Sequence, residues 1–165
     1  VVGIDASRAD TQKTKTNLEW LQKNRQPPMR PSFRVMRGDS TNLDRTGLPQ
    51  IDGIATEPIL LPKYTRNPEP KAAGEVIHDV QEIYERSLRS FSGILERNSR
   101  VAIMTPVLID QTGRSRALDI DHALKDAGFR PYFPQVAQFN AKYPQRVSTT
   151  KKKIIQRNLY VATLT

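Results

Sequence analysis

The chain has 165 residues, of which 37% are hydrophobic, and this is enough for one domain with a core of its own. It contains no cysteine, which excludes disulfides, thiolate zinc sites and cysteine nucleophiles, and its two histidines leave so little for metal chemistry that we predict no metal site. No apolar run approaches the length of a membrane span and no secretory leader opens the chain, so we expect a cytoplasmic protein with no membrane partner. Because Val1 lies directly inside an apolar, strand-like run, we also expect the natural N-terminus to lie further upstream.

The formal net charge of +9 is concentrated towards the C-terminus. Residues 127–165 contain seven Lys or Arg and no Asp or Glu, and the first 126 residues supply the remaining +2. A basic face of this kind favours nucleic acid or another anionic surface over a merely soluble basic protein. The candidate nucleic-acid contacts are Lys151, Lys152, Lys153 and Arg146, and a solvated turn is the alternative for the three lysines.

In chain order, apolar strand-like runs alternate with amphipathic helices. Ser7 is expected to cap the first helix, and Pro27 and Pro28 to stop it. The first part of the chain is predicted to contain a strand over 1–5, a helix over 9–23, a strand over 33–36, a turn at 38–40, a loop or short helical turn over 41–50 and a strand over 51–56.

The second part of the chain begins with a surface loop over 61–70, which contains three prolines. Apolar residues at intervals of three and four then predict a long helix over 72–96. It is followed by an apolar strand over 100–109, a helix over 117–126, weaker strand or hairpin segments over 131–136 and 138–144, and a last strand over 154–164. This order favours a doubly wound α/β sheet with an antiparallel edge at its C-terminal end.

Polar residues follow the first two predicted strands, where ligands bind in open α/β sheets. Asp5, followed by Ala6, ends the first strand, and a carboxylate there can accept two hydrogen bonds from a ribose diol; a helix N-cap is the structural alternative. Gly38 allows a sharp turn after the second strand, and Asp39 beside Ser40 can accept from an exocyclic amine such as that of adenine.

The third strand ends at Thr56, followed by Glu57 and Pro58. Proline fixes the backbone with its carbonyl available, so the carboxylate and a main-chain oxygen can together hold an amino group. Such a clamp orients the nitrogen lone pair towards a methyl donor, and a plain proline-terminated loop is the alternative. The three strand ends are separated by about 34 and 18 residues, which is the layout of adenosyl-cofactor enzymes.

The residues of this layout resemble the class I methyltransferase domain of the THUMP-associated tRNA guanosine-N2 methyltransferases, over nearly the whole chain. The matching segments are 2–5, 14–20, 38–40, 52–58, 84–95, 101–106 and 157–161. The resemblance implies a Rossmann-like doubly wound sheet with an antiparallel C-terminal edge. It also implies that residues 1–165 are a partial catalytic domain, lacking the first strand and its glycine-rich motif.

The resemblance further implies transfer of a methyl group from S-adenosylmethionine to an exocyclic amine of a nucleic-acid base, with guanosine N2 in tRNA as the expected target and RNA as the partner. In that family the acid that corresponds to Asp5 binds the ribose, and the turn that corresponds to Gly38-Asp39-Ser40 contacts adenine. The cofactor-binding residues would then be Asp5, Ala6, Asp39 and Ser40, and the catalytic residues Glu57, Pro58, Ile59 and Leu60.

The catalytic segment departs from the family's Asp-Pro-Pro-Tyr motif at three positions. Glu57 keeps the acceptor but reaches one methylene further, and Ile59 replaces the second proline. Leu60 offers no aromatic face on which a flipped-out base could stack. Tyr64, four residues later, would have to provide that face instead. Two alternatives therefore remain: a non-catalytic relative that binds RNA or a protein partner, and a nicotinamide-dependent enzyme, which a Gly-x-Gly-x-x-Gly turn would identify.

Side chains outside the strand ends give weaker signals. His78 and His122 are expected to face solvent on helices, and Ser-His-Asp chemistry lacks its strand–turn–helix context. Arg114 and Arg116 flank the loop after the 100–109 strand, where they would border the mouth of a substrate site.

Overall fold

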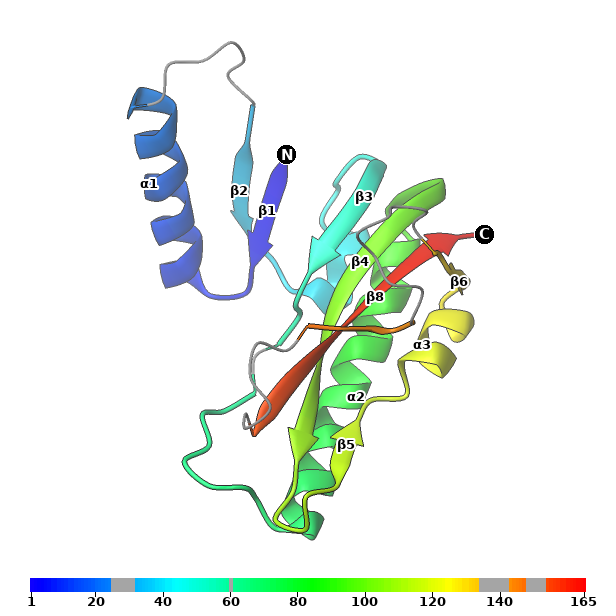
Figure 1. Ribbon diagram of the computed structural model, residues 1–165. Coiled ribbons are helices and arrows are strands. Elements are labelled where there is room, and N and C mark those ends of the chain that lie inside the picture. Colours follow the sequence, from blue (N-terminus) through cyan, green and yellow to red (C-terminus); the bar gives the residue numbers. More distant parts are fainter. Residues whose placement is uncertain (25–31, 60, 134–142, 148–153) are drawn as a thin grey trace.

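The structure is a computed structural model that describes residues 1–24, 32–59, 61–133, 143–147 and 154–165 (Figure 1). Its elements, in chain order, are β1 (Val2–Asp5), α1 (Arg8–Asn24), β2 (Arg34–Arg37), the 3-10 helix η1 (Ser40–Arg45), β3 (Ile51–Thr56), α2 (Pro70–Ser92), β4 (Leu95–Ile109), β5 (Ser115–Ala117), α3 (Ile120–Asp126), β6 (Phe129–Pro131), β7 (Gln145–Arg146) and β8 (Ile155–Leu164). No helix within these ranges has both the length and the apolar character needed to cross a membrane.

The strands form two sheets. β1 and β2 pair in parallel, and a larger sheet has the order β3-β4-β8-β6, with β5 attached to β4 and β7 to β8. β3 runs parallel to β4, whereas β8 and β6 are antiparallel to their neighbours, so the predicted antiparallel C-terminal edge is confirmed. Among the described residues β1 pairs only with β2 and β3 only with β4, which is why the expected single sheet is divided. β1, β2, β3 and β4 all point the same way (Figure 1).

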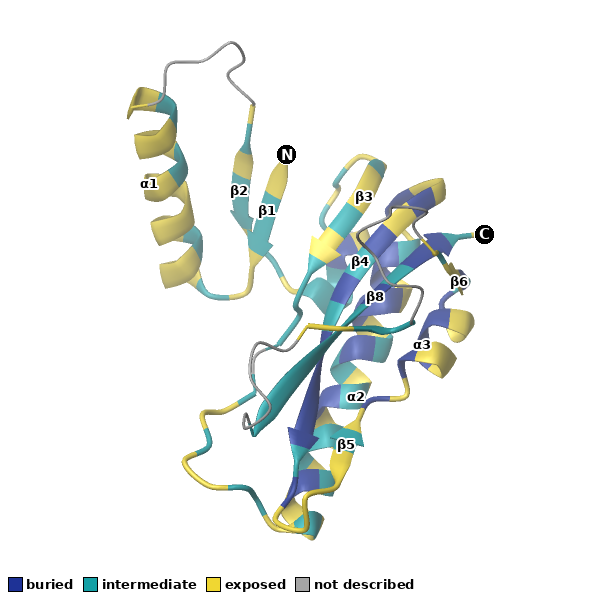
Figure 2. Cartoon of the chain, in the orientation of Figure 1, coloured by how far each residue is buried: buried dark blue, intermediate teal, exposed yellow. Residues whose placement is uncertain are grey.

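The core lies between α2 and the larger sheet. Val80, Tyr84, Leu88 and Phe91 recur at intervals of three and four along α2, and all are at most 5% exposed. They pack against buried residues of β4 such as Ile103. Figure 2 shows the buried surface concentrated on α2 and on the strands that it covers.

The predicted long helix ends four residues earlier than its apolar pattern suggested. Gly93 caps α2, and Ile94 N donates to Phe91 O in the closing turn. Leu95 continues the helical spacing in the sequence, but it is buried as the first residue of β4. The spacing predicted the wrong helix end because a buried strand follows the helix after only two residues, Gly93 and Ile94.

Other elements also differ from their predicted ranges. The strand predicted over 100–109 begins at Leu95, as β4. Residues 115–117 pair with β4 as β5, so α3 begins only at Ile120. Of the segment expected as a strand over 131–136, only Pro131 lies in a strand, at the end of β6 (Phe129–Pro131), and residues 134–136 lie outside the described residues. Most of the segment expected over 138–144 also lies outside them. α1 has the predicted position but buries none of its residues, and Trp20 is 63% exposed because only the small sheet lies beside it.

Candidate active site

The carboxyl ends of β1 and β2 are adjacent. Asp5 lies opposite Arg37 in the parallel register, and Gly38 N donates to Asp5 O at 3.0 Å. A Cβ at position 38 would lie 2.8 Å from Ile4 Cγ2, so glycine is required for this close approach. The two strand ends that the sequence singled out, with Asp5 and Asp39, are therefore brought together.

Asp5 has one carboxylate oxygen bound to its own turn. Its Oδ1 accepts from Ser7 N at 2.7 Å, and Ser7 Oγ in turn accepts from Asp10 N at 3.2 Å as the predicted cap of α1. Asp5 is exposed, and its Oδ2 has no hydrogen-bond partner among the described residues. The carbonyl of Ala6 accepts from Arg37 Nε at 3.0 Å, which ties the β1 end to β2. One acceptor of Asp5 thus remains for a ligand.

Asp39 and Ser40 are held by the elements that they begin. Asp39 Oδ1 accepts from the backbone N and the hydroxyl of Thr41, at 2.9 and 2.8 Å, as the N-cap of η1. These bonds, led by the backbone one, lower the pKa of Asp39 below its ordinary value, so it is ionised at neutral pH. The Ser40 hydroxyl lies 2.9 Å from Ser87 Oγ of α2. Ser40 therefore anchors the turn to the core, and Asp39 is the residue that faces outward.

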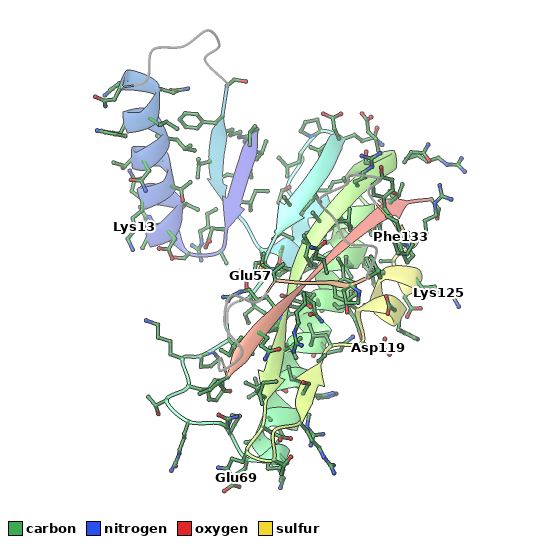
Figure 3. All side chains as sticks on the ribbon, in the orientation of Figure 1. Lys13, Glu57, Glu69, Asp119, Lys125 and Phe133 are labelled. Carbon is green, nitrogen blue, oxygen red and sulfur yellow. The ribbon has the colours of Figure 1, made fainter. Side chains whose placement is uncertain are left out.

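The end of β3 carries an ion pair that the sequence did not indicate. Glu57 follows β3 directly, and its Oε1 accepts from Arg157 Nε of β8 at 2.6 Å. The Glu57 side chain is 28% exposed and that of Arg157 37%, so solvent reaches the pair from one side. Oε2 of Glu57 has no partner in the described part of the chain and is left to accept an N–H group. Figure 3 shows Glu57 at the end of β3.

A buried tyrosine lies beneath this pair. Tyr84 of α2 donates from its hydroxyl to Met104 O at 2.8 Å and is fully buried. Burial, and then the negative charge of Glu57, raise the pKa of Tyr84 far above its ordinary value, so its phenol stays protonated and acts as a fixed donor. Arg157 and Tyr84 were missed as site residues because both come from elements distant in sequence.

The remaining predicted residues are only partly placed. Pro58 and Ile59 are half-buried, and Ile59 packs against the core rather than facing a ligand; Leu60 lies outside the described residues. Arg146 is exposed on β7 and bonds to Gln156 Oε1. The three lysines 151–153 are also outside the described residues.

Both histidines face solvent, as expected. His78 is exposed on α2. His122 is 65% exposed, and its Nδ1 lies 3.3 Å from Asp126 Oδ2 in the next turn of α3. Neither histidine lies at the end of β1, β2 or β3, where the candidate site residues are.

No protein-family model matches the chain, and no curated protein matches it. Solved structures do. TrmN from Thermus thermophilus matches over 100% of this chain with a TM-score of 0.54 and 16% identity, and the chain spans only 36% of the length of TrmN. An rRNA methylase from Streptococcus thermophilus matches over 100% of the chain and 74% of its own length, with a TM-score of 0.50 and 14% identity. A SAM-dependent methyltransferase from Methanosarcina mazei matches over 99% and 81%, with a TM-score of 0.51 and 10% identity. The likeness shows the fold: the chain has the Rossmann-like α/β architecture that was predicted.

Proposed function

We propose that this chain is part of an S-adenosylmethionine-dependent methyltransferase that acts on an exocyclic amine of a nucleic-acid base, with guanosine N2 in tRNA as the first substrate to test. The fold is shared with solved methyltransferases, one of them TrmN. The observation that carries the proposal is Glu57, which stands at the end of β3 with one carboxylate oxygen fixed by Arg157 and the other open. Because the chain spans only 36% of the length of TrmN, the activity of the whole protein is proposed here as well.

The ends of β1 and β2 would bind the cofactor. Asp5 Oδ2 would accept from the ribose hydroxyls, with the backbone at Ala6 alongside, and the ionised Asp39 would accept from the adenine amine. Ser40 would contribute by holding the turn against Ser87. When bound, S-adenosylmethionine would supply the electrophilic methyl group.

The unpaired edges of β1 and β3 are suited to one further parallel strand. β1 is hydrogen-bonded only to β2, and β3 only to β4, within the part of the chain that the structure describes. We propose that a strand from outside residues 1–165 lies between them and carries the glycine-rich turn of the cofactor site. Such a strand would join the two sheets into one.

Glu57 would hold and orient the target amine. Its Oε2 accepts one amine hydrogen, which aims the nitrogen lone pair at the methyl carbon. As the new N–C bond forms and the S–C bond breaks, positive charge develops on the nitrogen, and the adjacent carboxylate stabilises it. The amine then loses a proton to Glu57 or to water. Because Arg157 fixes Oε1, the carboxylate is already oriented before substrate binds.

The test is methyl transfer from labelled S-adenosylmethionine to unmodified tRNA, together with calorimetric titration of the cofactor. We expect Glu57→Ala to reduce transfer by about 100-fold or more while cofactor affinity stays unchanged. Asp39→Ala should weaken cofactor binding and serves as the converse variant. If the Glu57→Ala variant transferred methyl groups at the wild-type rate, Glu57 would not be the residue that holds the target amine.

The same ion pair supports a second candidate, a non-catalytic domain that binds RNA. In that case Arg157 would simply neutralise Glu57 as a structural contact. Binding of tRNA with no heat of cofactor binding, in a chain that also carries the additional strand, would favour this candidate over the methyltransferase.

A further inference from the structure

The larger sheet extends well beyond the end of β3, where Glu57 lies. β3 ends opposite Ile103, but β4 continues to Ile109, paired with β8 on one side and with β5 on the other. The part of β4 beyond Ile103, residues 104–109, is therefore about 20 Å long. Figure 1 shows this three-stranded arm running past the end of β3, with the loop that leads to α2 beside it.

A fully buried carboxylate fixes the tip of the arm. Asp110 is 0% exposed, and its Oδ1 accepts from the backbone N and hydroxyl of Thr112, at 2.9 and 2.6 Å, and from Arg114 N at 3.0 Å. Its Oδ2 accepts from Arg116 Nε at 3.0 Å. The turn also contains Gly113 at a φ of +78°. Asp110 therefore holds the turn in one conformation, and its negative charge is buried.

The loop before α2 is hydrogen-bonded to the same tip. Asn67 Nδ2 donates to Asp110 O at 3.1 Å, and Gln111 N donates to Pro68 O at 2.9 Å. Arg66, next to Asn67, is thereby placed on the same end of the arm as Arg114. Two segments that are more than 40 residues apart in sequence form one surface.

The exposed charge on this surface is mainly positive. The segments 61–69 and 110–116 contain Lys63, Arg66 and Arg114, which we call the tip cations, together with Arg116, which is paired with Asp110. Lys63, Arg66 and Arg114 are exposed and form no ion pair with any described residue. Glu69, labelled at the end of the arm in Figure 3, is the one exposed acid of these two segments.

We propose that the tip cations bind the phosphate backbone of the nucleic-acid substrate whose target base lies at Glu57. The inference rests on the proposed function and adds a second contact region to it. Arginine and lysine side chains on a fixed turn position a nucleic-acid backbone without reading its sequence.

The test compares two double charge reversals in the full chain. Arg66→Glu with Arg114→Glu removes two tip cations, and Arg97→Glu with Lys125→Glu makes the same change of charge at exposed positions of β4 and α3, away from the tip and outside the basic residues 127–165. Binding of a fluorescent tRNA-derived stem–loop is measured by anisotropy across a range of KCl concentrations. Circular dichroism and thermal melting confirm that both variants fold.

We expect the tip variant to lose affinity at least tenfold at low salt, with a salt dependence shallower by about one unit of slope per lost phosphate contact. The control should keep the wild-type slope. Equal losses in both variants, or wild-type binding by the tip variant, would overturn the proposal. Its failure is distinct from that of the proposed function, because cofactor binding and methyl transfer by the wild type are measured separately and would persist if the RNA backbone docked on another surface.

Discussion

Arg157 and Glu57, 100 positions apart in the sequence, are joined by a hydrogen bond of 2.6 Å between Nε and Oε1. Arg157 lies on β8 opposite Pro106 of β4, so its side chain reaches past β4 to the end of β3. Both side chains are partly buried, which keeps Glu57 in one orientation. They are also partly exposed, so Oε2 of Glu57 is accessible to a substrate. This contact links the antiparallel edge of the sheet to the candidate catalytic residue.

A double-mutant cycle measures the strength of this link. We expect Arg157→Ala and Glu57→Gln to show a coupling free energy of about 1 kcal/mol in urea unfolding, since the pair is only partly buried. The control is the exposed pair of Arg86 and Glu82, at 3.9 Å, whose coupling should be about 0.5 kcal/mol or less. Equal coupling in the two cycles would show that the Glu57 contact is no more than a surface ion pair.

The buried carboxylate of Asp110 makes stability depend on pH. Its hydrogen bonds, led by that from the Thr112 hydroxyl, lower its pKa to about 2 from the ordinary 3.8. A carboxyl with a lowered folded-state pKa stabilises the fold above its unfolded pKa, and this contribution is lost as the pH falls through the folded value. The free energy of unfolding should therefore fall between about pH 4 and pH 2.

Asp110→Asn isolates this contribution. The variant should be less stable than the wild type at neutral pH, and the difference should narrow as the pH falls from 4 to 2. Urea unfolding at several pH values measures both curves. If the two curves stay parallel over that interval, Asp110 is not the group that titrates.

Two serines of α2, Ser87 and Ser90, hold the turn that carries Asp39. Ser90 Oγ accepts from Leu43 N at 2.6 Å, in a buried contact between α2 and η1. Removing the acceptor leaves a buried N–H unsatisfied, so Ser90→Ala should destabilise the fold by about 1–3 kcal/mol. Ser92→Ala is the control, because among the described residues the Ser92 hydroxyl donates only to Arg89 O of the same helix, and its loss should change stability by less than about 0.5 kcal/mol. Similar losses in the two variants would argue against an anchoring role for Ser90.

The local elements of this fold were accessible from the sequence. The strand over 51–56 and the positions of Asp5 and Asp39 at strand ends follow from short apolar runs that end in polar residues. Local patterns fix such features because a strand and its turn are contiguous. The helix end at Ser92 was misplaced because the apolar residues that begin β4 continue the helical spacing.

The partners of the site residues were not accessible in the same way. Arg157 carries no local sign that it pairs with Glu57, because that contact depends on β8 lying next to β4. The burial of Asp110 likewise depends on the loop before α2 covering the turn. Whether Asp5, Asp39 and Glu57 bind ligands stays a prediction.

The close approach of Gly38 to β1 gives the most direct test of how the cofactor residues are placed. An added Cβ would lie 2.8 Å from Ile4 Cγ2, and a β-branched side chain has little freedom to move away. Gly38→Ala should therefore destabilise the fold by about 1–3 kcal/mol and weaken cofactor binding, as β1 and β2 are forced apart beside Asp5. Gly74→Ala on α2 is the matched control. It meets no atom within 4 Å and should stabilise the helix by up to about 1 kcal/mol.

A second variant separates steric crowding from a change in the turn itself. Combining Gly38→Ala with Ile4→Ala removes the clashing methyl group, so the double variant should recover cofactor affinity relative to Gly38→Ala, even though losing the Ile4 side chain costs some stability. Calorimetric titration with S-adenosylmethionine, in the chain that includes the additional strand, measures this recovery. If the double variant binds no better than Gly38→Ala, the spacing of β1 and β2 is not what positions Asp5 and Asp39 for the cofactor.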